Sequence, residues 1–125
     1  MIDFATDSVF RLSECSPGDV EKHVGPILVP GEQLLWTFKT VRDFVAFTDK
    51  RIIAVNVQGM TGKKKDFTTL PYNKIQVFSI ETAGTFDLDA ELDLWFSTVG
   101  NIRFEFKGRV DIRAISQLIA TYVLG

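Results

Sequence analysis

The chain contains one cysteine, Cys15, and one histidine, His23, among its 125 residues. A single thiol forms no intrachain disulfide and builds no cysteine metal cluster, and a free thiol is typical of a reducing compartment. No recognised motif places a nucleophile beside the lone histidine, so the sequence offers no catalytic pair. We expect His23 to be an exposed or capping residue of a helix, and we expect no catalytic residue, no metal ligand and no cofactor.

Basic charge is also scarce, since 14 lysines and arginines face 16 aspartates and glutamates, for a net charge of -2. Nucleic-acid binders usually have a basic excess, so the composition argues against nucleic acid as a partner. No apolar run approaches the ~20 residues that span a bilayer. The first twelve residues include Asp3, Asp7 and Arg11 and lack the basic start and apolar core of a signal peptide. We therefore expect a cytoplasmic location.

Phenylalanine, in contrast, is abundant, with eleven copies. Aromatic residues favour strands and bury large areas, so their number favours a β-rich core. The length suits one domain. Within it, we expect residues 1–32 to form a helical extension and residues 33–125 to form the main unit. Ser16 and Pro17 indicate a helix start, Gly25 and Pro26 interrupt that helix, and four apolar residues fall on one of its faces. These are Val20, Val24, Ile27 and Leu28.

Seven runs downstream have the alternation or the β-branched and aromatic content of strands. Most of the links between them are short, which predicts antiparallel neighbours. Residues 58–65 are predicted to be a surface loop because they hold two glycines and three lysines. A final helix is predicted after Asp111, with an apolar stripe at helical spacing that includes Ile112, Ile115 and Ile119. The predicted strands lie within residues 33–40, 44–47, 52–57, 66–70, 75–82, 92–98 and 102–106.

Four stretches of the chain, in this order, are similar to the bacterial pleckstrin homology (PH) family, which has also been described as a domain of unknown function. They are residues 47–53 (FTDKRII), 59–64 (GMTGKK), 70–72 (LPY) and 81–92 (ETAGTFDLDAEL). The resemblance implies a mainly β, PH-like, seven-stranded antiparallel open barrel capped by a C-terminal α-helix, with the helical extension before it. It also implies ring-shaped homo-oligomers and no enzymatic activity. It supplies no catalytic or ligand residues.

Lys63, Lys64 and Lys65 form the main basic cluster. Many eukaryotic PH domains bind phosphoinositides through basic residues on loops between strands, so the resemblance raises the hypothesis of an anionic-lipid or membrane site here. Three lysines near an anionic surface contribute roughly 1 kcal/mol each, which is too little for stable anchoring. We favour a solvated loop and keep lipid binding as the alternative function.

Asp87, Asp89, Glu91 and Asp93 alternate, as oxygen ligands do in calcium loops. The glycine and glutamate that an EF-hand requires are absent from their positions, so a solvated strand face is the simpler interpretation, with a weak divalent-cation site as the other. This face could also pair with Lys63 or Lys64 of a neighbouring subunit.

The sequence thus predicts a non-enzymatic module that assembles with itself, as a scaffold or a protein-interaction adaptor. Aromatic residues in excess of what one small barrel hides indicate interfaces. We expect the subunit interface to include Phe44, Phe47, Phe67, Phe86, Asp87 and Asp89.

Overall fold

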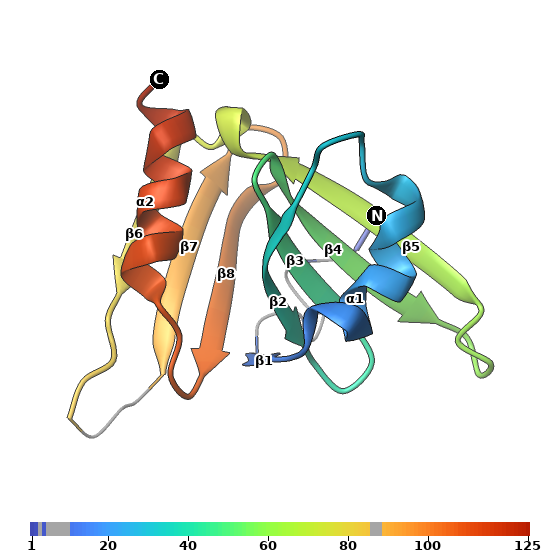
Figure 1. Ribbon diagram of the computed structural model, residues 1–125. Helices are drawn as coiled ribbons and strands as arrows, with labels where there is room; N and C mark the ends of the chain where they lie inside the picture. The colour runs from blue at the N-terminus through green and yellow to red at the C-terminus, as the bar shows by residue number, and fades with distance from the viewer. Residues whose placement is uncertain (3, 5–10, 86–88) are drawn as a thin grey trace.

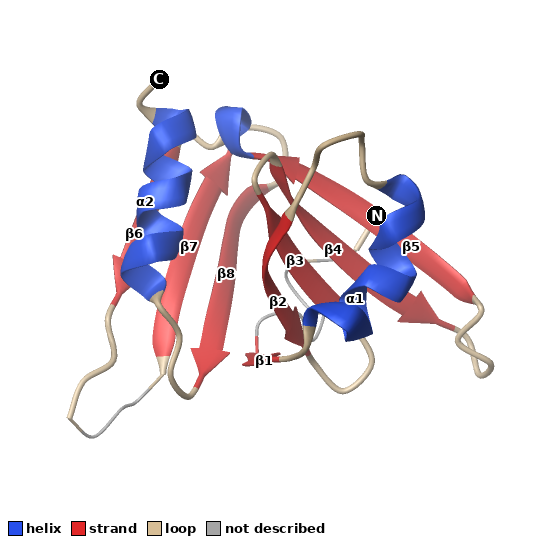
Figure 2. Ribbon diagram, in the orientation of Figure 1, coloured by secondary structure: helices blue, strands red, loops and turns tan. Residues whose placement is uncertain are grey.

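The computed structural model describes residues 1, 2, 4, 11–85 and 89–125. Eight strands form one sheet that folds over on itself, and two α-helices pack on it (Figures 1 and 2). The strands are β1 (Arg11–Glu14), β2 (Leu34–Lys39), β3 (Phe44–Thr48), β4 (Arg51–Gln58), β5 (Lys64–Pro71), β6 (Val77–Glu81), β7 (Ala90–Phe96) and β8 (Gly100–Lys107). The helices are α1 (Pro17–Val24) and α2 (Ile112–Val123), with 3-10 turns η2 (Gly25–Ile27) and η3 (Tyr72–Lys74).

The sheet order is β5-β4-β3-β2-β1-β8-β7-β6, so β5 and β6 are its two edges and the barrel is open. One half consists of β2 to β5 and the other of β6 to β8, and β1 joins them. α2 packs against β6, β7 and η3, whereas α1 packs against β2, β3 and β4 (Figure 1). This architecture confirms the predicted mainly β open barrel with its C-terminal helix.

β1 was not predicted, and it makes the N-terminal segment part of the sheet. It pairs antiparallel with β2 and parallel with β8, where Leu12 lies opposite Phe106. Only Leu12 of its four residues is buried. A strand this short has no periodic signal of its own, and its pairing with a strand some ninety residues later leaves no trace in the local sequence.

β4 separates two apolar clusters. Its side chains alternate between the sheet faces, so Ile52 and Ala54 belong to the main core while Ile53 and Val55 face α1. This strand is therefore covered by apolar groups on both faces. Within the main core, Phe47 contacts Phe38, Phe104 and Phe106 with ring centroids 5.8 to 6.2 Å apart.

α1 confirms the helix predicted from Ser16 and Pro17, with Ser16 as its N-cap residue. Val20 and Val24 are fully buried against the outer face of the sheet. The chain then changes to a 3-10 turn at Gly25, since Pro26 interrupts the α-helical hydrogen bonding. A second, smaller core therefore lies outside the barrel, between α1 and β3–β4.

α2 begins after Asp111, whose Oδ1 accepts a hydrogen bond from the Ala114 N–H at 3.1 Å. Ile112, Ile115 and Ile119 are buried, as their spacing predicted. At the other end of the helix, the Tyr122 ring stacks on Tyr72 of η3 with centroids 5.1 Å apart. The helix is thus attached to the barrel along its whole length.

The first residues of the chain also enter the main core, which the sequence did not indicate. Ile2 and Phe4 are buried there. The Ile2 N–H donates to Thr68 Oγ1 at 3.3 Å, and the terminal amine lies 2.9 Å from an Asp66 carboxylate oxygen. These contacts attach the N-terminus to edge strand β5.

Candidate functional site

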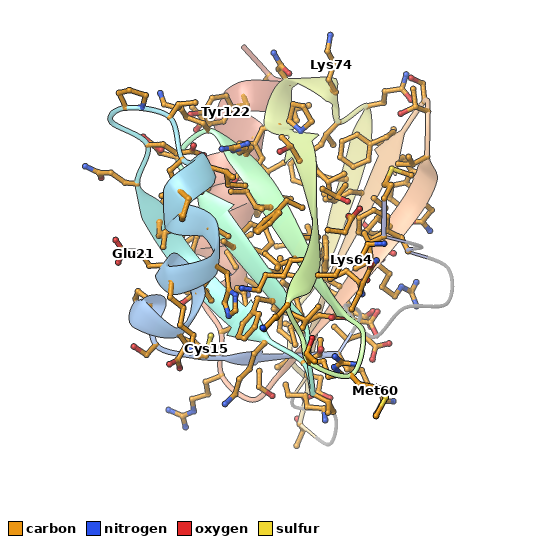
Figure 3. The ribbon with its side chains drawn as sticks, turned by 90° about the vertical axis from the view of Figure 1, so that its right-hand side faces the viewer. Cys15, Glu21, Met60, Lys64, Lys74 and Tyr122 are labelled. Carbon is orange, nitrogen blue, oxygen red and sulfur yellow. The ribbon has the colours of Figure 1, made fainter. Side chains whose placement is uncertain are left out.

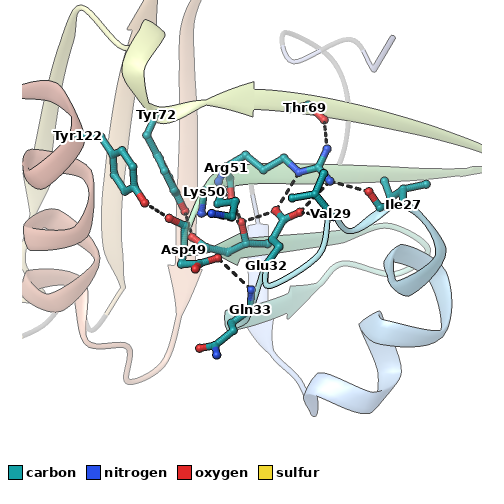
Figure 4. A network of polar contacts seen from close by, with 11 residues as sticks. Ile27, Val29, Glu32, Gln33, Asp49, Lys50, Arg51, Thr69, Tyr72 and Tyr122 are labelled. Carbon is teal, nitrogen blue, oxygen red and sulfur yellow. Dashed lines mark hydrogen bonds and ion pairs between the residues drawn. The ribbon is translucent and has the colours of Figure 1, made fainter.

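A polar network at one end of the barrel is centred on Arg51 and Glu32 (Figure 4). Arg51 begins β4, and Glu32 lies in the connection that precedes β2. Arg51 Nε and Nη2 donate to the two carboxylate oxygens of Glu32 at 2.9 and 3.0 Å, and the other bonds of the guanidinium go to the Ile27 carbonyl and Thr69 Oγ1. The network therefore joins the N-terminal extension to β4 and β5.

Glu32 is one of the few charged residues that the fold buries, and its side chain has no exposed surface. Burial by itself would raise its pKa, but hydrogen bonds from Arg51 and Thr48 outweigh this effect and lower the pKa to about 2. Glu32 is consequently ionised at neutral pH, and its charge is balanced by Arg51.

The remainder of the network explains the FTDKRII stretch as a structural motif. The Thr48 hydroxyl donates to Glu32 and accepts from the N–H groups of Lys50 and Arg51, which forms the tight turn between β3 and β4. The hydroxyl of Tyr72 donates to the Thr48 carbonyl at 2.7 Å, and that of Tyr122 donates to the Asp49 carbonyl. The motif thus holds the β3–β4 turn, η3 and α2 together, and every polar group named here already has a partner within the chain.

The lysine cluster is not a loop as predicted, because Lys64 and Lys65 belong to β5. They pair with Gln58 and Val57 of β4, which itself extends to Gln58. Side chains of successive strand residues point to opposite faces, so the strand separates the two lysines. Figure 3 shows Lys64 on the strand, with Met60 in the connecting loop. Lys63 and Lys64 are exposed, whereas Lys65 is half-buried and near enough to His23 to lower its pKa.

The acidic segment is strand β7 from Ala90 onward, with Glu91 and Asp93 on the face away from the core. Asp93 accepts from Arg103 Nε of β8 at 2.9 Å, and Arg103 also lies 3.9 Å from Glu91. Arg103 therefore partners both carboxylates within the subunit. Asp89 is exposed and accepts from the Gly108 N–H at 3.3 Å, and Asp87 lies outside the described residues.

Glu91 also stands in a row of carboxylates across three strands. It lies opposite Glu81 of β6 and opposite Glu105 of β8. Burial raises its pKa, and the neighbouring Glu81 and Glu105 raise it further, against the opposing effect of Arg103. The outer face of β6–β8 therefore carries concentrated negative charge next to a free sheet edge. Within the described part of the chain, no group of three or more histidine, cysteine, aspartate or glutamate residues has the arrangement of a metal site.

The aromatic residues expected at an interface differ in how far they are buried. Phe47 is fully buried in the barrel, so it has no surface to offer another subunit. Phe44 is half-buried against His23, with ring centroids 4.6 Å apart, and Phe67 is 36% exposed on edge strand β5. Phe86 lies outside the described residues.

His23 is a half-buried residue of α1, and neither an exposed residue nor a cap. Its ring lies on Phe44, and its Nδ1 is buried without a hydrogen-bond partner among the described residues. Burial lowers its pKa, and Lys65 and Lys22 lower it further. Cys15 precedes α1, and burial raises the pKa of its thiol, which favours an unreactive protonated form.

The sheet edges are the features that sequence reasoning did not locate. β6 pairs with β7 on one side, and no described strand pairs with its other side. Val77 on this strand is 58% exposed. The second edge, β5, has the N-terminal residues attached to it through Asp66 and Thr68. Assigning edges requires the strand order, which local periodicity does not contain.

Neither α1 nor α2 has the length and hydrophobicity of a membrane-crossing helix, and the rest of the described chain contains no such helix.

Comparison with known proteins gives consistent matches over nearly the whole chain. The chain is 44% identical to the uncharacterized protein YjqA of Bacillus subtilis strain 168 over 110 residues, which cover 86% of this chain and 88% of YjqA. It is 32% identical to the uncharacterized protein YozO of the same organism over 102 residues, covering 82% and 88% of the two chains.

Two solved structures share both sequence and fold. A DUF1696 family protein with a pleckstrin-homology domain from Shewanella loihica PV-4 superposes with a TM-score of 0.72 at 39% identity, covering 90% of this chain and 97% of its own. A pleckstrin homology domain from Shewanella amazonensis SB2B gives a TM-score of 0.61 at 44% identity, with coverage of 90% and 92%. The family model described as the bacterial PH domain matches residues 3–123. With the open barrel, the C-terminal helix and this match in agreement, the chain belongs to the bacterial PH domain family.

Proposed function

We propose that this protein is a non-enzymatic module that assembles with copies of itself into a ring-shaped homo-oligomer and serves in the cytoplasm as a scaffold or protein-interaction adaptor. The observation that supports this proposal best is the free edge of β6. Its backbone N–H and C=O groups pair with β7 on one side, and no described strand pairs with them on the other. Val77 exposes apolar surface beside them. Edges of this kind pair with other chains unless they are covered.

A second copy of this chain is the occupant we infer for that edge. Each copy has two different edges, β5 and β6, at opposite ends of one sheet order, and pairing one with the other would repeat head to tail. Head-to-tail contacts generate closed rings when the rotation between copies closes. Exposed Phe67 on β5 and Val77 on β6 would supply apolar contacts on the two sides.

Light scattering after size exclusion tests this proposal. The expected mass is several times 14.1 kDa. A Val77→Lys variant places a charge on the edge and should shift the population towards monomer. The control is Val41→Lys, since Val41 is 98% exposed in the β2–β3 turn and belongs to neither edge strand, and this variant should retain the wild-type mass. A wild-type chain that remains a monomer at tens of micromolar would contradict the proposal.

Lipid binding through Lys63 to Lys65 remains the alternative hypothesis. Lys63 and Lys64 are exposed in and beside the β4–β5 connection, which favours a role for these two, while Lys65 is half-buried. Sedimentation with anionic and neutral liposomes separates the two functions. Pelleting that requires anionic lipid and is lost in Lys63→Gln/Lys64→Gln would favour lipid binding, whereas the assembly proposal predicts that the protein stays in the supernatant.

A further inference from the structure

A cavity of ≈ 690 Å³ lies where α2 begins, at the end of the molecule where β1 and the end of β8 also lie (Figure 1). Its wall is built from four parts of the chain that are distant in sequence. These are β1, β2, residues that flank the β6–β7 connection (Thr82, Ala83 and Ala90), and the segment that leads from β8 into α2. Its size is within the range of small-molecule sites in proteins, about 300–1,000 Å³.

Part of the wall is apolar. Trp36 of β2 lines the cavity and is only partly buried against the core, and Val110 and Ile112 line it from the start of α2. Trp36 follows a register irregularity in the β2–β3 pairing. An indole ring in this position offers a flat surface on which an aromatic or aliphatic group can pack.

Two exposed arginines, Arg109 and Arg113, are also among the residues that line the cavity. Neither makes a hydrogen bond or an ion pair with any residue that the structure describes. Arg113 lies in the first turn of α2, where the helix dipole disfavours a cation, and that turn contains no acidic residue. Arg113 therefore does not stabilise α2 at this position.

Two carboxylates share the wall. Asp111 is engaged as the helix cap with the Ala114 N–H. Glu14 of β1 also lines the cavity, and its carboxylate has no hydrogen-bond or ion-pair partner among the described residues, so it opposes anion binding from that wall. Arg109 and Arg113, which have no partner among the described residues, both come from the segment that enters α2, with Asp111 between them in sequence.

We propose that this cavity binds a small organic anion, with an apolar body on Trp36 and a carboxylate or phosphate group at Arg109 and Arg113. Guanidinium groups bind both kinds of oxyanion through paired N–H donors. None of the residues that line the site belongs to β5 or β6, and the proposal does not rest on self-assembly.

Tryptophan fluorescence of the full chain in a Trp95→Phe background tests this proposal, because Trp36 is then the only tryptophan. The probes are 4-phenylbutanoate and its neutral analogue 4-phenylbutanamide. The carboxylate should change the Trp36 emission saturably, with an affinity about tenfold or more above that of the amide. Arg109→Gln/Arg113→Gln should remove this preference, and Glu14→Gln should increase the affinity for the carboxylate.

The matched control is Lys63→Gln/Lys64→Gln, which removes the same charge from an exposed site elsewhere and should leave the affinity unchanged. Melting curves establish that each variant is folded, and the single Arg109→Gln variant replaces the double variant if the latter is not. Equal affinities for carboxylate and amide, retention of the preference in the arginine variant, or no change in Trp36 emission would each overturn the proposal.

Discussion

Arg51 donates two hydrogen bonds to Glu32, and this bidentate ion pair links the segment before β2 to the start of β4. The Arg51 side chain is 17% exposed and that of Glu32 is fully buried. Removal of one member of a buried pair leaves the other charge without compensation, which costs far more than the loss of a surface pair.

Glu32→Gln should therefore lower the free energy of unfolding by about 3 to 5 kcal/mol, as measured by urea denaturation. Glu105→Gln is the control, because Glu105 and Arg11 form a surface pair 3.6 Å apart. That variant should change stability by less than about 1 kcal/mol. Similar losses in the two variants would show that the buried pair has no special role.

Acid should weaken the fold through the same carboxylate. The pKa of Glu32 is about 2 in the folded chain against an ordinary value of 4.5, so the unfolded chain takes up its proton first as pH falls. The resulting stabilisation is fully present above pH 4.5 and is lost as pH falls towards 2. Urea unfolding as a function of pH should show this loss, and Glu32→Gln should show a smaller slope in that window.

His23 should add a second acid dependence nearer to neutral pH. Burial, Lys65 and Lys22 lower its pKa below 6.5, so the folded chain favours the neutral ring. The associated stability is present above pH 6.5 and is lost as pH falls below it. Unfolding midpoints on either side of pH 6.5 should differ less in His23→Leu than in the wild type.

An NMR titration of the His23 ring provides the direct measurement. Lys65→Gln should raise the pKa of His23, whereas Lys63→Gln should leave it in place, because Lys63 is not among the groups that act on this ring. A His23 pKa at or above 6.5 in the wild type would be inconsistent with a ring buried against Phe44.

Removal of a charge from the carboxylate row on β6–β8 should stabilise the fold, whereas removal of the Glu32 charge should destabilise it. Burial and Glu81 raise the pKa of Glu91, so removing the charge of Glu81 relieves repulsion at neutral pH. Glu81→Gln should stabilise the fold by about 0.5 kcal/mol, the usual size of a cross-strand pair effect, as measured by thermal unfolding. Glu21→Gln, on the exposed face of α1, should have no such effect. Destabilisation by Glu81→Gln would contradict the repulsive interpretation.

The cap of α2 is a further point where one side chain stabilises one element. Asp111→Ala removes the acceptor for the Ala114 N–H and should lower stability by about 1 kcal/mol in urea denaturation. Asp111→Asn keeps an oxygen acceptor and should retain most of that stability. Equal effects of the two substitutions would indicate that the hydrogen bond is unimportant.

Several errors of sequence interpretation have a common cause. The two glycines and three lysines of residues 58–65 predict a surface loop, yet β4 provides a pairing partner that extends β5 to Lys64. The number of phenylalanines places Phe47 at an interface, but Phe38, Phe104 and Phe106 surround it. Both outcomes depend on what a distant strand places opposite the residue.

The sequence alone determined the elements whose signals are local. Alternation predicted seven strands, proline and aspartate at helix starts predicted α1 and α2, and the quoted stretches identified the family. Only the tertiary structure decided the insertion of β1 between β2 and β8, the pairing of Arg51 with Glu32, the burial of Ile2 and Phe4, and the strands that are left as edges. The physical reason is the sequence separation between the residues that interact. Periodicity and capping act within a few residues, whereas register, burial and edge position result from contacts between segments far apart in the chain.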